Sequence, residues 1–138
     1  MERRLAAILA ADVVGYSRMM GANEVGTLTA IRAWHTDIIQ PLMTKHSGRV
    51  VKLMGDGVLA EFASAVNAVE CAVELQKTMA AASEGVAEGR RITLRVGINL
   101  GDVIVEGTDL YGDGINIAAR LEAMAEPGGI CLSEDAHR

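Results

Sequence analysis

The sequence predicts a single α+β domain in which an antiparallel-rich sheet packs against helices. Three observations favour this class. Half of the 138 residues are hydrophobic, so one domain can bury a core without disulfides or a structural metal. Short β-prone apolar runs alternate along the chain with stretches of helical periodicity. Short glycine-containing turns separate these runs, and no long linker divides them.

The first element is expected to be a buried strand, followed by a helix. Residues 5–14 form an apolar run that is typical of a strand buried on both faces. Residues 15–21, bounded by glycines, are expected to form a loop. Asn23 is a suitable N-cap for a helix with apolar residues at helical spacing. Pro41 should kink or end that helix.

A hairpin and a second helix are expected next. Residues 49–54 and 58–62 are two β-prone runs, and the Gly-Asp-Gly sequence at residues 55–57 joins them. Such a joint between β-prone runs indicates a hairpin. Ser64 is a suitable N-cap for a helix over residues 65–82, which are rich in Ala, Val and Leu.

A second pair of strands is expected after a polar loop. Residues 83–91 are polar and contain glycine, which predicts a loop. Residues 93–99 alternate as a strand does, and residues 102–105 are expected to pair with them across a turn at Leu100-Gly101.

The remaining elements complete the order β-α-β-β-α-β-β-α-β. A turn over residues 106–114 leads to a helix over residues 115–125, and residues 130–132 form a last strand. The opening βαββαβ is the ferredoxin-like pattern, which further β and α elements extend. Ser133 would cap another helix, yet the sequence stops at Arg138, so a piece of a longer protein is expected.

Charge and cysteine usage exclude several classes of partner. Thirteen Lys and Arg against eighteen Asp and Glu give a net charge of −5, which argues against a duplex nucleic acid or an anionic membrane as partner. No apolar run approaches the length of about 18 residues that a membrane span requires. Cys71 and Cys131 each lie in an apolar run, which fits a reducing compartment. A cytoplasmic domain is therefore expected.

Two aspartates interrupt apolar or turn-forming stretches. Asp12 ends the first apolar run, and Asp56 lies at the hairpin tip. In a ferredoxin-like sheet these positions meet at one edge, and two carboxylates without His or Cys suit a hard cation such as Mg²⁺. Taken alone, each also has an ordinary structural explanation, Asp56 as a turn residue and Asp12 as a loop cap.

Lys52 is unusual because it lies inside a β-prone run. The chain has only three lysines, the others being Lys45 and Lys77. Strict alternation places Lys52 on the same face of the strand as Val50 and Met54. It is either an edge-strand lysine that deters aggregation or a lysine aimed into a ligand site.

Asn116 and Arg120 lie four residues apart in the last predicted long helix, and hence on one face of it. A cap and a solvated charge are the ordinary explanations for them. The sequence lacks the glycine-lysine loop of P-loop enzymes, a zinc motif and a nucleophile elbow.

Joined in order, these features resemble the class III nucleotidyl cyclase catalytic domain, of the bacterial adenylate cyclase type. The resemblance spans nearly the whole chain and rests on four separate stretches, which read LAADVVGYS (9–17), VKLMGDGVLAEF (51–62), LRVGINLG (94–101) and YGDGINIAARL (111–121).

The resemblance implies a metal site and a purine site. Asp12, Asp56 and the backbone carbonyl of Val13 would hold two Mg²⁺ ions, with Mn²⁺ as a substitute. Lys52 and Asp109 would read the purine. Lys52 donates and Asp109 accepts, which matches the ring-nitrogen acceptor and the exocyclic amine of adenine, whereas guanine presents the opposite pattern. ATP is therefore the expected substrate.

The resemblance also implies a head-to-tail homodimer, in which Asn116 and Arg120 of one subunit act on a substrate whose metals the other subunit holds. Asn116 would orient the ribose and Arg120 would stabilise the reacting phosphate. Asp109 is identified as the adenine reader by its distance from Gly112, in preference to Thr108 or Asp113.

Residues 1–138 are thus expected to form an adenylate cyclase domain that produces cyclic AMP and pyrophosphate from ATP. The family usually continues further, with a lysine that contacts the triphosphate, so the domain is expected to be truncated at its C-terminal end and fused to a C-terminal regulatory region. The alternatives are a catalytically incomplete cyclase-like module that binds nucleotide or dimerises, a guanylate cyclase, and an unrelated ferredoxin-like binding domain.

Overall fold

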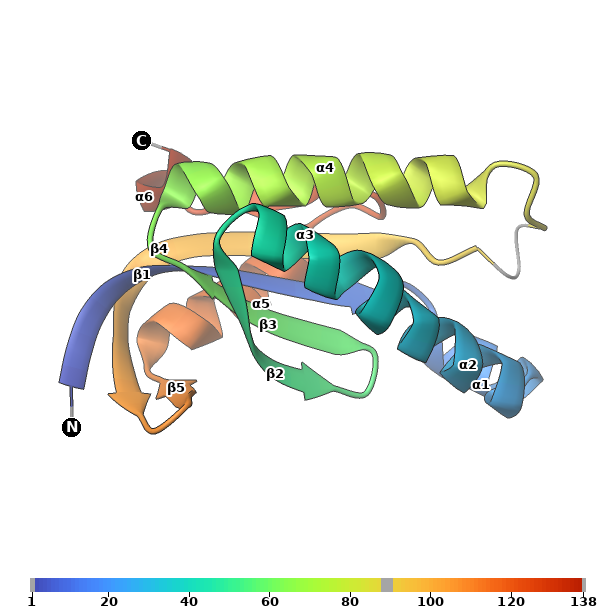
Figure 1. Cartoon of the computed structure of the whole chain (residues 1–138), viewed down its shortest axis with the longest axis horizontal. Helices are drawn as coiled ribbons and strands as arrows, with labels where there is room; N and C mark the ends of the chain where they lie inside the picture. The colour runs from blue at the N-terminus through green and yellow to red at the C-terminus, as the bar shows by residue number, and fades with distance from the viewer. Residues whose placement is uncertain (1, 88–90, 138) are drawn as a thin grey trace.

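A computed structural model describes residues 2–87 and 91–137, and its architecture is of the predicted α+β class (Figure 1). The strands form one curled sheet and are β1 (Glu2–Val13), β2 (Gly48–Met54), β3 (Gly57–Phe62), β4 (Leu94–Glu106), β5 (Asp109–Tyr111) and β6 (Ile130–Leu132). The helices are α1 (Tyr16–Ala22), α2 (Glu24–Trp34), the π-helical stretch η1 (His35–Ile39), α3 (Gln40–Lys45), α4 (Ala65–Ser83), α5 (Asp113–Met124) and α6 (Glu134–His137). Within the described ranges, none of them combines the length and the apolarity that a membrane crossing needs.

The strand order confirms the ferredoxin-like core. The sheet runs β2-β3-β1-β4-β5, with β6 beside β4 in parallel, and the neighbours along the main path are antiparallel. The longest ladder joins β1 to β4 and runs from the pair Glu2 and Val105 to the pair Val13 and Leu94. The predicted hairpin of β2 and β3 is also present.

The predicted turn at Leu100-Gly101 is wrong. These residues lie inside β4, which continues to Glu106, and the hairpin is made instead at Gly107-Thr108, which leads into β5. The reason is the length of β1. Because β1 pairs with β4 over its whole length, Gly101 is held opposite Ala6 in the ladder and the strand does not reverse there.

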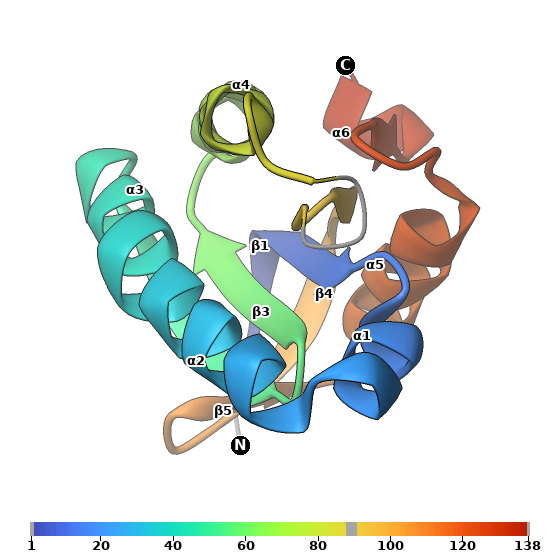
Figure 2. The same cartoon turned by 90° about the vertical axis from the view of Figure 1, so that its right-hand side faces the viewer.

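The sheet has an apolar core on each face. Odd-numbered residues of β1, from Ala7 to Val13, pack with side chains of α2, α3 and α4. Even-numbered residues of β1, from Ala6 to Ala10, pack instead with Ala118 of α5. Figure 2 shows α4, α3 and α2 on one side of the central strands and α5 on the other. Asp12, which is also even-numbered, therefore belongs to the α5 face.

The segment expected as a loop at residues 15–21 is instead mostly helical, as α1. Gly15 precedes α1 with a left-handed φ of 71°, and Met19 on α1 is buried against the main core. The predicted cap at Asn23 is confirmed, because its side-chain oxygen accepts a hydrogen bond from the N–H of Gly26 at 3.0 Å.

Pro41 changes the helix without ending it. It lies in the first turn of α3, and the regular α-helix is interrupted just before it by η1. A proline donates no hydrogen bond and crowds the carbonyl four residues earlier, and a π-helical stretch accommodates both effects. The cap at Ser64 is confirmed by its hydrogen bond from Asn67 at 3.3 Å. Of the loop predicted over residues 83–91, residues 88–90 lie outside the described residues.

Candidate functional site

The two aspartates predicted to bind a cation are brought together by neighbouring strands. β1 pairs with β3, and Asp56 lies in the turn that precedes β3. One carboxylate oxygen of Asp56 accepts a hydrogen bond from the backbone N–H of Val13 at 3.1 Å. The Oδ1 of the adjacent Asp12 is buried and has no hydrogen-bond partner among the described residues. Two acids 44 positions apart therefore meet at the end of β1.

A third acid, Glu122 of α5, faces the same place, and the sequence analysis gave it no role. The pKa of Glu122 is raised from 4.5 to about 8, first by burial, then by a hydrogen bond with Asp12 and by the charges of Asp12 and Asp56. We refer to Asp12, Asp56 and Glu122 as the acid cluster. Arg95, directly opposite Asp12 on β4, partly offsets these charges, and its buried Nε has no hydrogen-bond partner in the part of the chain that the structure describes.

The donors at this place fit a hard divalent cation. A buried carboxylate oxygen without a partner and a neighbouring acid held protonated both indicate missing positive charge. Over residues 2–87 and 91–137, no three His, Cys, Asp or Glu side chains are arranged to bind a metal ion together, so Glu122 is not assigned as a ligand. Two carboxylates and a backbone carbonyl suit Mg²⁺, which usually keeps waters and binds substrate phosphates.

The residues predicted to read a purine form an ion pair. The Nζ of Lys52 lies 3.1 Å from the Oδ2 of Asp109, although β2 and β5 are far apart in the strand order. The other oxygen of Asp109 accepts a hydrogen bond from the N–H of Leu110 at 2.8 Å. That backbone hydrogen bond and then Lys52 lower the pKa of Asp109. Among Asp109, Thr108 and Asp113, it is the side chain of Asp109 that meets Lys52.

The predicted face of Lys52 is wrong in one respect. A β-bulge shifts the register between Val50 and Lys52. Val50 therefore packs against the core that α2, α3 and α4 cover, whereas Lys52 lies opposite Leu59 of the core that α5 covers. The extra residue, Val51, also packs against the core that α5 covers. A bulge carries the strand one residue further and reverses the alternation of its side chains. Lys52 thereby comes to the face that α5 covers.

Asn116 and Arg120 lie one turn apart on α5, and both are exposed. Ala118, between them in sequence, is buried against the sheet. Within the described residues, no hydrogen bond or ion pair links Asn116 or Arg120 to the two aspartates at the end of β1. The single chain therefore brings together the pairs Asp12 with Asp56 and Lys52 with Asp109, and it presents Asn116 and Arg120 to solvent.

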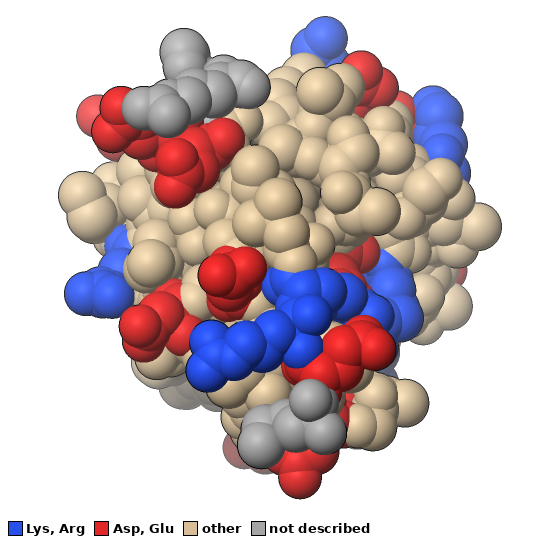
Figure 3. All heavy atoms as spheres, turned by 90° about the vertical axis from the view of Figure 1, so that its left-hand side faces the viewer, with Lys and Arg blue, Asp and Glu red and all other residues tan. Residues whose placement is uncertain are grey.

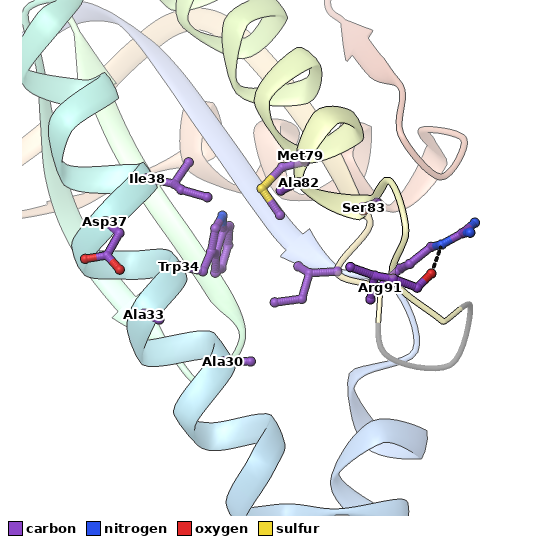
Figure 4. A pocket seen from close by; sticks show the side chains of 11 residues that line it. Ala30, Ala33, Trp34, Asp37, Ile38, Met79, Ala82, Ser83 and Arg91 are labelled. Carbon is purple, nitrogen blue, oxygen red and sulfur yellow. Dashed lines mark hydrogen bonds between the residues drawn. The ribbon is translucent and has the colours of Figure 1, made fainter.

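One hollow in the surface lies elsewhere and has a different chemistry. A cavity of about 280 Å³ opens between the helix formed by α2 and η1 and the end of α4 (Figure 4). Trp34, Ile38 and Met79 are among its apolar lining residues, while Asp37 and Arg91 supply charge at single points. None of the predicted site residues lines this cavity. Among the described residues that line it, Asp37 is the one carboxylate, so they do not supply the paired carboxylates that a cation needs.

Comparisons with known proteins all point to one kind of catalytic domain. Residues 3–138 match the family model of the adenylate and guanylate cyclase catalytic domain. A Rhizobium meliloti protein named "Putative adenylate cyclase 3" is 58% identical over 137 residues, which are 99% of this chain and 23% of that protein. The adenylate cyclase of Streptomyces coelicolor is 38% identical over 135 residues, which cover 96% of this chain and 33% of that protein.

A solved structure is similar over the same extent. The adenylate/guanylate cyclase/hydrolase from Silicibacter pomeroyi is 45% identical, with a TM-score of 0.91, and the match covers 99% of this chain and 79% of that one. The chain thus spans about a quarter to a third of the length of the curated relatives that it matches.

Proposed function

The chain belongs to the adenylate and guanylate cyclase catalytic domain family, and from that premise we propose that it converts ATP to 3′,5′-cyclic AMP and pyrophosphate. The observation that carries the proposal is that one chain holds both a pair of acids and a pair of opposite charges. Asp12 and Asp56 supply unneutralised acid for a cation, and Lys52 and Asp109 supply a donor beside an acceptor for a base.

The end of β1, where Asp12 and Asp56 meet, would hold two Mg²⁺ ions through these two side chains and the carbonyl of Val13. When bound there, Mg²⁺ lowers the pKa of the ribose 3′-hydroxyl and neutralises charge on the triphosphate. The hydrogen bond from the N–H of Val13 fixes the orientation of the Asp56 carboxylate. The second oxygen of Asp56 is then left for ligand binding. Mn²⁺ shares the preference for carboxylate and carbonyl oxygens and would substitute.

Base selection follows from the donors and acceptors of the Lys52–Asp109 pair. Lys52 donates to the acceptor nitrogen of the adenine ring, and Asp109 accepts from the exocyclic amine. Guanine presents a donor and an acceptor in the opposite places, so it would leave Lys52 and Asp109 without matched hydrogen-bond partners. The names of the two curated relatives, both called adenylate cyclases, agree with this choice.

A second copy of the chain would complete the site. Asn116 and Arg120 are exposed and point away from their own chain's core, so they are available to a substrate bound mainly by a partner. A head-to-tail homodimer with two-fold symmetry would build two equivalent sites from the same residues.

The reaction is an in-line displacement at the α-phosphorus. The 3′-oxygen of ATP forms a bond to the α-phosphorus as its proton passes to water, and the bond to the pyrophosphate oxygen breaks. Asn116 orients the ribose so that the 3′-oxygen lies in line. Arg120 donates charge-assisted hydrogen bonds to the oxygens on which negative charge accumulates. The products are cyclic AMP, pyrophosphate and one proton.

The test is a cyclisation assay of the purified chain with ATP and, in parallel, with GTP, in Mg²⁺ or Mn²⁺. Cyclic AMP and equimolar pyrophosphate are expected from ATP, with a slower reaction from GTP. The Asp12→Asn variant should lose this activity, and Asp37→Asn, which changes an exposed acid in η1, should retain it. Faster conversion of GTP would make the chain a guanylate cyclase. Tight nucleotide binding without turnover, also in longer chains of the same protein, would make it a binding or dimerisation module.

A further inference from the structure

Two arginines share one buried glutamate near the start of β1. Glu61 on β3 is only 9% exposed. Arg4 donates to both of its carboxylate oxygens at 2.8 Å, and Arg49 donates to one of them at 2.9 Å. Burial opposes ionisation of Glu61, but the hydrogen bonds and charges of the two arginines outweigh it and lower its pKa. Figure 3 shows this side of the molecule, where basic side chains gather and acidic ones border them.

Arg49 has a second contact that Arg4 lacks. Its other terminal nitrogen, Nη1, donates to the backbone carbonyl of Thr108 at 2.9 Å. Thr108 lies in the tight turn between β4 and β5 and immediately precedes Asp109, and Gly107 in the same turn has a left-handed φ of 63°. One guanidinium therefore connects the turn before β5 to a buried carboxylate on β3, although β1 and β4 lie between these two strands in the sheet order.

The β-bulge makes this contact compatible with that of Lys52. Residues three apart on a regular strand point to opposite faces. Arg49 lies opposite Glu61 and Lys52 lies opposite Leu59, two residues away on β3, so the bulge at Val51 returns both cations to one face. From there Arg49 meets Thr108 and Lys52 meets Asp109, so β2 contacts the last residue of the turn and the first residue of β5.

We infer that Arg49 is a positioning residue for purine recognition, which holds Asp109 in place through the carbonyl of Thr108 and so helps to set the preference for adenine over guanine. This rests on the proposed function. In the free chain Lys52 and Asp109 bind each other, and a base that uses both must weaken that pair. The bond from Arg49 to Thr108 involves no group that the base needs, so it persists and keeps the Asp109 carboxylate at a fixed distance from Lys52.

The matched test compares Arg49→Gln with Arg4→Gln. Each variant removes one guanidinium from Glu61, but only Arg49→Gln releases the carbonyl of Thr108. Arg49→Gln should lower the ratio of kcat/KM for ATP over GTP by about three- to tenfold, mainly through a higher KM for ATP. Arg4→Gln should leave that ratio within about twofold of the wild type while the melting temperature falls by a similar amount in both variants. Arg49→Lys keeps the positive charge but has one terminal nitrogen in place of the two that contact Glu61 and Thr108. Its ratio of kcat/KM for ATP over GTP should lie between those of the wild type and Arg49→Gln.

A second measurement does not depend on turnover. Amide hydrogen exchange over residues 107–111, followed by mass spectrometry, should accelerate in Arg49→Gln and stay unchanged in Arg4→Gln. Equal shifts of the substrate ratio in the two glutamine variants, or unchanged exchange in Arg49→Gln, would overturn the positioning role. A Lys52→Ala control distinguishes failure of the purine-reading proposal from failure of the positioning role of Arg49. If Lys52→Ala also leaves the ratio unchanged, the purine-reading proposal fails together with this inference; if it changes the ratio and Arg49→Gln does not, this inference alone fails.

Discussion

The acid cluster and the Lys52–Asp109 pair are both charged, but only the second is balanced within the chain. A buried oxygen of Asp12 has no hydrogen-bond partner among the described residues, and the pKa of Glu122 is raised by burial, by its hydrogen bond with Asp12 and by the charges of Asp12 and Asp56. Lys52 and Asp109 neutralise each other at 3.1 Å, and the pKa of Asp109 falls instead of rising.

The difference indicates two modes of ligand binding. A cation adds to the acid cluster what the cluster lacks, so binding should relieve repulsion and stabilise the fold. A base at the Lys52–Asp109 pair must exchange an existing contact for new ones, so its affinity depends on how well the two side chains are already placed. The acid cluster should therefore govern the rate, and the pair should govern the choice of nucleotide.

The largest effect is expected from Asp56→Asn. The amide keeps the size of the side chain and can still accept the hydrogen bond from Val13, but it removes one of the two charges available to a cation. Turnover should fall by about 100-fold or more, in line with the loss of a preorganised charge at a reacting phosphate. Calorimetric titration with Mn²⁺ should show weaker binding in parallel. Unchanged Mn²⁺ affinity would separate Asp56 from the cation site.

The next effect tests whether the two halves of the site come from different copies. Asp12→Asn and Asn116→Ala should each be nearly inactive alone. Mixed in equal amounts, they should recover about one quarter of the wild-type rate, since half of the dimers are mixed and each mixed dimer holds one intact site. The recovered rate per protein should increase with protein concentration and decrease on dilution, because it depends on the formation of mixed dimers. An inactive mixture that nevertheless contains mixed dimers would place all of these residues in a single-chain site.

A smaller effect is expected when the balanced pair is reversed. Lys52→Glu combined with Asp109→Lys preserves an ion pair but exchanges the donor and the acceptor, which is the pattern that guanine requires. The ratio of kcat/KM for ATP over GTP should fall by about tenfold or more. Steady-state kinetics with both nucleotides measure it. A variant that stays folded and keeps the wild-type ratio would remove Lys52 and Asp109 from base recognition.

Sequence reasoning reached the positions that local rules determine. Asp56 stands at a hairpin tip that Gly-Asp-Gly predicts, and the ferredoxin-like order then places it near Asp12. The features that it missed depend on tertiary pairing. Nothing in the two β-prone residues Val50 and Val51 signals the register shift, which decides the face of the sheet on which Lys52 lies.

The place of Glu122 likewise depends on how α5 docks on the sheet. A Cβ at Gly97 of β4 would collide with the backbone of Glu122 and with the carbonyl of Ala118, so the absence of a side chain there lets α5 approach closely. That approach brings Glu122 to Asp12. In the sequence, Gly97 and Glu122 are 25 positions apart, and neither carries a local pattern that relates them.

The smallest effect concerns the pH dependence of stability without metal. The pKa of Glu122 rises from 4.5 to about 8 on folding, so the folded chain holds a proton that the unfolded chain has released between these values. The stabilisation is complete below pH 4.5 and is lost as the pH rises through about 8. The melting temperature of the metal-free chain should therefore fall by about 2–5 °C between pH 6 and pH 8.5. Glu122→Gln, which is neutral throughout, should reduce that fall, and the exposed control Glu126→Gln should not. A decline in Glu122→Gln as steep as in the wild type would mean that folding does not raise the pKa of Glu122.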